Sequence, residues 1–188
     1  NRQSVPDIHV PAAMELWANG IENAYTRYRT TVFGNRSIYP NLVRNYSYAY
    51  AHIGIEVPDG ARWANSGDAQ CGNTPLLSAT DQHFTLANYT AARIGTRYPG
   101  SRFQLYAYDG HANIPSAGIA LHPQLDVQVV PTAFQSETSP KGLLNRWYNR
   151  HSHVSEYHYL NIAQWSGENP AIRLDDLQSA LFEERTIP

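Results

Sequence analysis

The chain has 188 residues, a formal net charge of −2 and 14 Lys and Arg residues. This length suits one domain with its own hydrophobic core, and the basic residues form no run, which argues against nucleic acid as a partner. No stretch of 18 apolar residues occurs, so the sequence predicts no membrane span. Cys71 is the single cysteine, which excludes an intramolecular disulfide.

The N-terminal half of the sequence predicts a strand between two helices. Apolar side chains recur at three- and four-residue steps, the pattern of an amphipathic helix, on both sides of a β-prone run. In chain order these elements are a helix over residues 11–29, a strand over 50–57, a polar loop over 61–80 and a helix over 81–98. Either Thr80 or Asp81 can cap the second helix, and Pro99 followed by Gly100 ends it.

The C-terminal half continues the alternation of strands and helices. Its predicted strands cover residues 102–108, 126–131 and 154–162, and its predicted helices cover 140–150 and 173–185. Such alternation favours a parallel sheet with right-handed crossovers. Because an eight-stranded barrel cannot close with four strands, the sequence predicts either a small open α/β sheet or half of a (β/α)8 barrel.

Polar and aromatic residues follow the predicted strands, where parallel α/β folds bind ligands. These residues are Asp59, Arg62, Trp63, Tyr108, Asp109, His111, Thr132, Gln135, Asn161, Gln164 and Trp165. Side chains of these types suit a sugar, because polar groups bind its hydroxyls and aromatic rings cover its apolar face. Glycoside cleavage needs two carboxyl groups, which Asp59 and Asp109 can supply. Asp-Gly is also a common turn pair, so both can instead simply close loops.

Other reaction classes find little support in the sequence. In the run "HSHVSEYHY", a strand would place His151 and His153 on one face and Glu156 and His158 on the other, so these side chains would not converge on a metal. Cys71 lacks the surroundings of a catalytic cysteine. The motifs of serine hydrolases, nucleotide-binding proteins and zinc peptidases do not occur. We therefore expect neither a metal nor a cofactor.

Four segments, by their order and spacing, resemble one protein family. They are "IGIEVPDGARW…CGN", "LANYTAARIGTRYPGSRFQLYAY", "LDVQVV" and "HVSEYHYLNIAQW", within about residues 50–165. These segments are similar to the bacterial domain-of-unknown-function 4838 family, a glycoside-hydrolase-like barrel related to α-glucuronidases and hexosaminidases. The resemblance implies a partial (β/α)8 barrel and a carbohydrate ligand.

The resemblance also implies roles for particular residues. Asp59 matches the acid at the end of a family strand, Tyr106 and Tyr108 match the family's "AY" strand, and Trp165 follows the last matching strand. The family loop often carries a pair of cysteines, whereas this chain has only Cys71 there. That difference leaves a metal or disulfide role of the loop without support.

From these observations we expect residues 1–188 to form one α/β domain, the central-to-C-terminal part of a barrel in a longer, extracellular or periplasmic protein. The remaining barrel segments or other domains of that protein would be its partners. We expect a glycoside hydrolase acting on a polysaccharide or glycan, with Asp59, Asp109 and Glu156 as catalytic candidates. The expected substrate-binding residues are Arg62, Trp63, Tyr106, Tyr108, His111, Gln135, Asn161, Gln164 and Trp165. Two alternatives are a non-catalytic glycan-binding or structural module on a degenerate barrel and a small α/β domain with an unrelated ligand.

Overall fold

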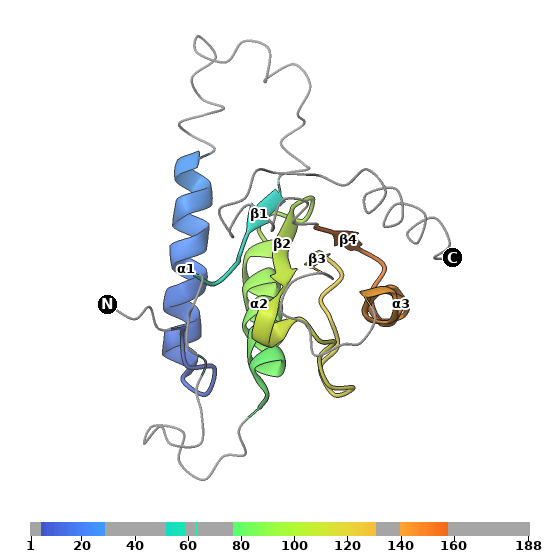
Figure 1. The fold of residues 1–188 in the computed structure, drawn as a ribbon. Helices are drawn as coiled ribbons and strands as arrows, with labels where there is room; N and C mark the ends of the chain where they lie inside the picture. The colour runs from blue at the N-terminus through green and yellow to red at the C-terminus, as the bar shows by residue number, and fades with distance from the viewer. Residues whose placement is uncertain (1–4, 29–51, 59–62, 64–76, 131–139, 158–188) are drawn as a thin grey trace, which may run out of the picture. The chain divides into compact units, whose positions relative to one another are not determined.

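The chain forms an α/β structure with a parallel four-stranded sheet in a computed structural model. The structure describes residues 5–28, 52–58, 63, 77–130 and 140–157. In chain order the elements are α1 (Pro11–Tyr28), β1 (His52–Gly54), α2 (Ala79–Gly95), β2 (Arg102–Ala107), the 3-10 helix η2 (Asp109–His111), β3 (Leu125–Val129), α3 (Pro140–Arg150) and β4 (Val154–Glu156) (Figure 1). The strand order is β1-β2-β3-β4. The predicted α/β class with parallel strands is confirmed, and this sheet is compatible with part of a barrel.

The described residues belong to two compact units. The first lies within Asn1–Leu105 and Pro115–Asp126, and the second within Tyr106–Ile114 and Val127–Pro188. None of the described helices combines the length and the hydropathy that a membrane crossing requires.

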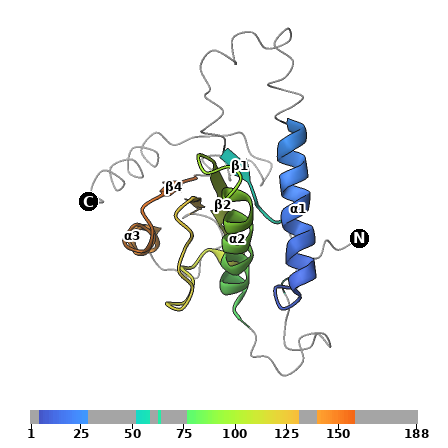
Figure 2. The same ribbon diagram turned by 180° about the vertical axis from the view of Figure 1, so that it is seen from behind.

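In the first unit, α1 lies alongside α2 (Figure 2). Charged and polar side chains join the two helices, and we call this group the helix-pair cluster: Glu15, Glu22, Tyr89, Arg93 and Arg97. The Tyr89 hydroxyl donates to Glu15 Oε2 at 2.6 Å, Arg93 Nη2 donates to Glu15 Oε1 at 3.1 Å, and Arg97 Nη1 donates to Glu22 Oε1 at 2.6 Å. The Tyr89 hydrogen bond and then Arg93 lower the pKa of Glu15 below its ordinary value of 4.5.

The helices begin and end close to the predicted residues. α1 and α3 confirm the helices predicted over 11–29 and 140–150. α2 begins before the predicted residue because Ser78 is its N-cap, with Ser78 Oγ accepting a hydrogen bond from Asp81 N at 3.0 Å. Thr80 lies inside the first turn and is buried. The prediction of Thr80 or Asp81 as the cap was therefore wrong.

A single side chain supports the link from α2 to β2. Gln124 Nε2 donates to the carbonyl oxygens of Tyr98, Pro99 and Ser101, the last at 2.8 Å. The helix ends at Gly95, where a Cβ atom would lie 2.2 Å from Gln124 Oε1. Because Gly95 has no Cβ atom, the Gln124 side chain fits in this space. The predicted helix continued to residue 98, so α2 ends earlier than predicted.

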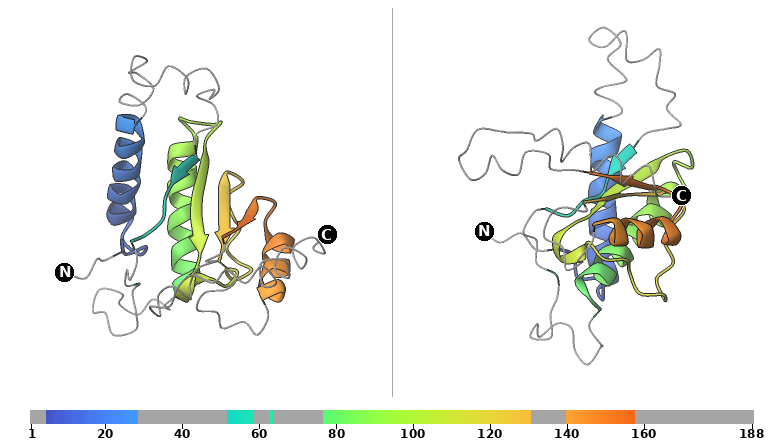
Figure 3. Two further views of the ribbon diagram at one scale, coloured as in Figure 1. Left: turned by 45° about the horizontal axis from the view of Figure 1, so that its top comes forward. Right: turned by 45° about the vertical axis from the view of Figure 1, so that its right-hand side comes forward.

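The strands have one buried face. β1 lies beside β2, with Ile53 in register with Phe103 (Figure 3). Alternation along β2 buries Phe103, Leu105 and Ala107 and leaves Arg102, Gln104 and Tyr106 half-buried. In β3 the buried residues are Leu125, Val127 and Val129. The apolar residues that predicted the strands therefore form the core.

Two strands are shorter than predicted. β1 has three residues, and residues 55–58 continue without strand geometry, although Ile55 N still donates to Gln104 O at 2.9 Å. β4 ends at Glu156. The β-prone composition locates these strands, but backbone pairing decides how far each extends. Parts of the predicted elements lie outside the described residues, namely 29, 50–51, 131, 158–162 and 173–185.

In the second unit, α3 is anchored by a buried tryptophan. Trp147 is 0% exposed, and its Nε1 donates to Ala112 O at 2.9 Å. Such a bond satisfies the indole N–H in the core. The Tyr148 hydroxyl, also on α3, donates to Glu156 Oε1 at 3.0 Å. This bond links the helix to the end of β4.

Candidate functional site

A carboxylate follows the end of β1. Glu56 lies between Ile55 and Val57, which are 3% and 6% exposed, and is itself half-buried. In extended chain, successive side chains point to opposite sides, so Glu56 points away from the core that its two neighbours enter. The alternation of side chains in this β-prone segment therefore places the Glu56 carboxylate outside the core.

The first turns of α2 supply a buried imidazole. His83 is 2% exposed. Its ring meets two aromatic rings edge-on: Trp63 with centroids 5.4 Å apart at 88°, and Phe84 with centroids 5.2 Å apart at 89°. Edge-to-face contacts of this kind favour one ring orientation. Trp63 and Phe84 therefore hold the imidazole of His83 in place.

A second imidazole ends η2, the short helix that follows β2. His111 is 9% exposed, and its backbone N donates to Tyr108 O at 3.1 Å, which closes the turn. This turn belongs to the second unit.

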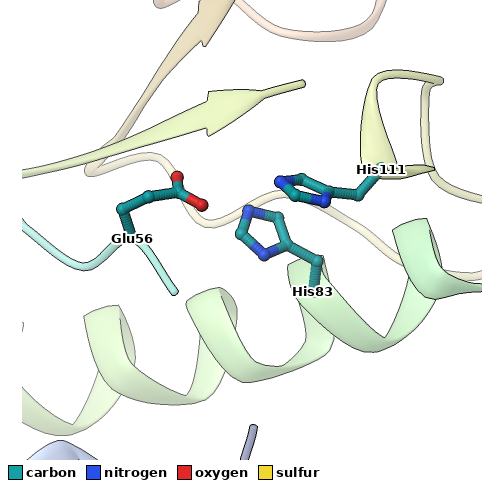
Figure 4. Close-up of side chains that lie close together, drawn as sticks. All are labelled: Glu56, His83 and His111. Carbon is teal, nitrogen blue, oxygen red and sulfur yellow. The ribbon is translucent and has the colours of Figure 1, made fainter. Parts of the chain in front are cut away.

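In the first unit, a carboxylate oxygen of Glu56 and a ring nitrogen of His83 lie within 4.8 Å of each other. Figure 4 shows these two side chains close together. We call Glu56 and His83 the Glu–His cluster.

The Glu–His cluster combines groups with useful chemistry. A carboxylate accepts hydrogen bonds, and a neutral imidazole has one donor and one acceptor nitrogen, so together they can bind hydroxyl groups or transfer protons. Glu56 follows the end of β1, and parallel α/β folds bind ligands at this end of their strands.

Several predicted site residues follow β1 and β2 in the structure. Trp63 contacts His83. Tyr108 is half-buried, and its carbonyl oxygen accepts a hydrogen bond from His111 N. Asp109 is the first residue of η2. The roles of these residues at a site stay predictions.

Other predicted site residues have different surroundings. The ring of Tyr106 packs against that of Tyr157, with centroids 5.7 Å apart at 73°. Glu156 accepts the hydrogen bond from Tyr148 on α3. The remaining candidates lie outside the described residues: Asp59, Arg62, Thr132, Gln135, Asn161, Gln164 and Trp165. Their roles stay predictions.

The sequence analysis missed Glu56 and His83. A signal for each existed: Glu56 is the polar residue within the apolar run "IGIEV", and His83 adjoins the stripe of apolar residues that begins at Phe84. His151 and His153 precede β4, which begins at Val154 as the predicted strand does, and their ring centroids are 5.9 Å apart.

Comparison of the chain with protein-family models, with curated proteins and with solved structures found no match.

Proposed function

We propose that this chain is a carbohydrate-active protein, a glycoside hydrolase built on part of a (β/α)8 barrel and acting on a polysaccharide or glycan. The observation that carries the proposal is the close approach of Glu56 and His83 just beyond the end of β1. Ligands of parallel α/β folds bind at this end of the strands. The resemblance to the domain-of-unknown-function 4838 family supports the same ligand class.

The residues around the cluster suit a sugar. Glu56 and His83 offer acceptors and donors for hydroxyl groups, and the half-buried indole of Trp63, which contacts His83, offers an apolar surface. Sugar sites in proteins need both kinds of surface, because a pyranose ring has polar edges and apolar faces. The aromatic and polar groups therefore support binding of a carbohydrate better than binding of a purely apolar ligand.

Hydrolysis requires two carboxyl groups that flank the glycosidic bond. We propose Asp59 and Asp109 for these roles. Asp59 lies in the segment that continues from Glu56, and Asp109 begins the same 3-10 turn that ends at His111. In the sequence, each acid therefore follows a strand: Asp59 comes after β1 and Asp109 after β2. Glu156 is a weaker candidate because its carboxylate bonds to Tyr148 on α3.

The test is a screen of the full chain against aryl glycosides and a glycan panel, recording both binding and turnover. Asp59→Asn and Asp109→Asn should each lower kcat by about 100-fold or more, because each removes an acid, base or nucleophile. Asp7→Asn is the control: Asp7 accepts a hydrogen bond from His9 N at 2.9 Å before α1, and Asn can accept the same bond.

Each outcome of the screen decides between the alternatives. Turnover that Asp59→Asn leaves unchanged removes Asp59 from catalysis. Binding without turnover in the unsubstituted chain identifies a glycan-binding module on a degenerate barrel. A chain that neither binds nor cleaves any member of the panel contradicts the proposal.

A further inference from the structure

We propose that one face of the sheet in the second unit binds a sugar ring of a neutral polysaccharide, with the ring of Tyr157 as the main contact. Four side chains form this surface, which we call the tyrosine face: Tyr106, Gln128, Ser155 and Tyr157. All four residues belong to the second unit. The proposal rests on the proposed function, because it assigns a binding surface to the same ligand class, but it concerns binding and not hydrolysis.

The pairing of β3 with β4 places three of these side chains together. Gln128 is in register with Ser155, and residues paired across adjacent strands point to the same side of a sheet. Tyr157 N donates to Val129 O at 2.8 Å, so the chain stays paired beyond the end of β4. Because side chains alternate along an extended chain, Tyr157 shares the face of Ser155.

The end of β2 adds Tyr106 to the tyrosine face. Its neighbour Ala107 is 0% exposed and points into the core, so Tyr106 points to the opposite side. The ring of Tyr106 meets the ring of Tyr157 nearly edge-on, with centroids 5.7 Å apart and planes at 73°. This contact requires both tyrosines to lie on the same face, and it favours one orientation of each ring. Rings that are already oriented lose little entropy when a ligand binds.

Solvent reaches the tyrosine face at the ends of the strands. Ser155 is exposed, Tyr157 is 38% exposed, and Tyr106 and Gln128 are half-buried. Tyr106 and Gln128 are each the next-to-last residue of a strand, and Tyr157 comes directly after β4. The face therefore lies at the C-terminal ends of the strands, where parallel α/β folds bind ligands.

The chemistry of the tyrosine face suits a neutral polyol. A tyrosine ring offers an apolar surface with a hydroxyl at its tip, and the Gln128 amide and the Ser155 hydroxyl can each donate and accept hydrogen bonds. None of the four side chains carries a charge, so the face gives no charge attraction to a phosphate or a polyanion. A purely apolar ligand would leave the amide and the hydroxyl without partners. A sugar ring, with polar edges and apolar faces, matches both kinds of group.

The experiment is affinity electrophoresis of the full chain in native gels that contain hydroxyethylcellulose, xylan, laminarin or dextran. We expect at least one of these neutral polymers to retard the chain. Tyr157→Ala should raise the Kd for that polymer about tenfold, because it removes the ring that covers the sugar. Tyr157→Phe keeps the ring, so its Kd should stay within about threefold of that of the unsubstituted chain. A chain that none of the polymers retards overturns the proposal.

The matched control is Tyr148→Ala. Tyr148 is 37% exposed, close to the value for Tyr157, but it lies on α3 and its hydroxyl donates to Glu156 Oε1. This variant should leave the Kd unchanged. Equal weakening by Tyr148→Ala and Tyr157→Ala contradicts the assignment to the tyrosine face, as does full affinity in Tyr157→Ala. Circular dichroism of every variant establishes that it is folded.

Two further measurements test other occupants of the tyrosine face. Carboxymethylcellulose shares the backbone of hydroxyethylcellulose but carries carboxylates, and retardation by this polymer and by no neutral one overturns the proposal. Sedimentation of the chain without polysaccharide tests whether a second copy binds there. A dimer that Tyr157→Ala abolishes, in a chain that no polymer retards, would assign the face to self-association instead.

Because the gels record binding rather than turnover, their outcome is separate from that of the glycoside screen. Cleavage of a glycan, together with full polysaccharide affinity in Tyr157→Ala, would keep the proposed function and overturn this proposal. Binding that depends on Tyr157, in a chain that cleaves no glycoside, would keep this proposal and contradict hydrolysis.

Discussion

The helix-pair cluster and the Glu–His cluster each bring together side chains from distant parts of the chain, but their chemistry differs. In the helix-pair cluster, two carboxylates face two arginines and a tyrosine hydroxyl, and each close contact pairs a donor with an acceptor. The Glu–His cluster instead places one half-buried carboxylate beside one buried imidazole. Ion pairs between helices hold the helices together, whereas a carboxylate beside an imidazole is a combination that can transfer protons.

The largest effect on stability is expected from His83→Ala in the Glu–His cluster. The side chain is 2% exposed and contacts two aromatic rings, so its removal leaves a cavity and should cost about 3 kcal/mol in the free energy of unfolding. Urea denaturation measures the change. Arg97→Ala is the comparison from the helix-pair cluster: its side chain is 61% exposed, and its loss should cost no more than about 1 kcal/mol. Equal losses in the two variants would contradict the assignment of His83 to the core.

A smaller effect is expected from Glu22→Ala in the helix-pair cluster. The Glu22 side chain is 9% exposed and lies 2.6 Å from Arg97 and 3.7 Å from Arg93. Removing the Glu22 carboxylate should lower the free energy of unfolding by about 1 kcal/mol. The cost stays small because the exposed Arg97 guanidinium can be hydrated by solvent and is not left as an unpaired buried charge. In 1 M NaCl the loss of unfolding free energy caused by Glu22→Ala should be smaller, because charges are then screened over about 3 Å. A loss that salt leaves unchanged would mean that Glu22 acts by packing rather than by charge.

The two clusters also differ in how far the sequence predicts them. The sequence predicted α1, α2 and α3 because the apolar residues on the buried face of a helix recur locally, at three- and four-residue steps. The sequence does not reveal, however, which charged residues on different helices pair with one another. Glu15 and Tyr89 are far apart in the chain, and only the packing of α1 on α2 brings them together.

The same limit applies to the Glu–His cluster. The rule that ligands bind where parallel strands end selected Trp63, which follows a β-prone segment and contacts His83. It could not include His83, which belongs to a helix, nor Glu56, which was counted as part of a strand that proved shorter. The approach of Glu56 to His83 is a tertiary property, and a single sequence does not encode it visibly.

Acid should weaken the helix-pair cluster through Glu15. The Tyr89 hydrogen bond and then Arg93 lower the pKa of Glu15 in the folded chain, so the stabilisation is fully present above the ordinary value of 4.5 and is lost as the pH falls below it. Tyr89→Phe should therefore raise the pKa of Glu15 toward 4.5, as measured by NMR titration of its carboxyl carbon. Tyr148→Phe, which removes a hydroxyl from Glu156 instead, should leave the pKa of Glu15 unchanged. Equal shifts in both variants would refute the assignment to Tyr89.

The smallest effect on stability is expected from Glu56→Gln. Gln has nearly the same shape as Glu and keeps an acceptor oxygen, and the side chain is half-buried, so the free energy of unfolding should change by no more than about 0.5 kcal/mol. Groups that serve a site often contribute little to folding, and their replacement can even stabilise the protein. A loss of about 1 kcal/mol, like that expected for Glu22→Ala, would instead make Glu56 a structural partner of the His83 imidazole. The contrast between the two clusters would then fail, because both would hold the fold together by charge.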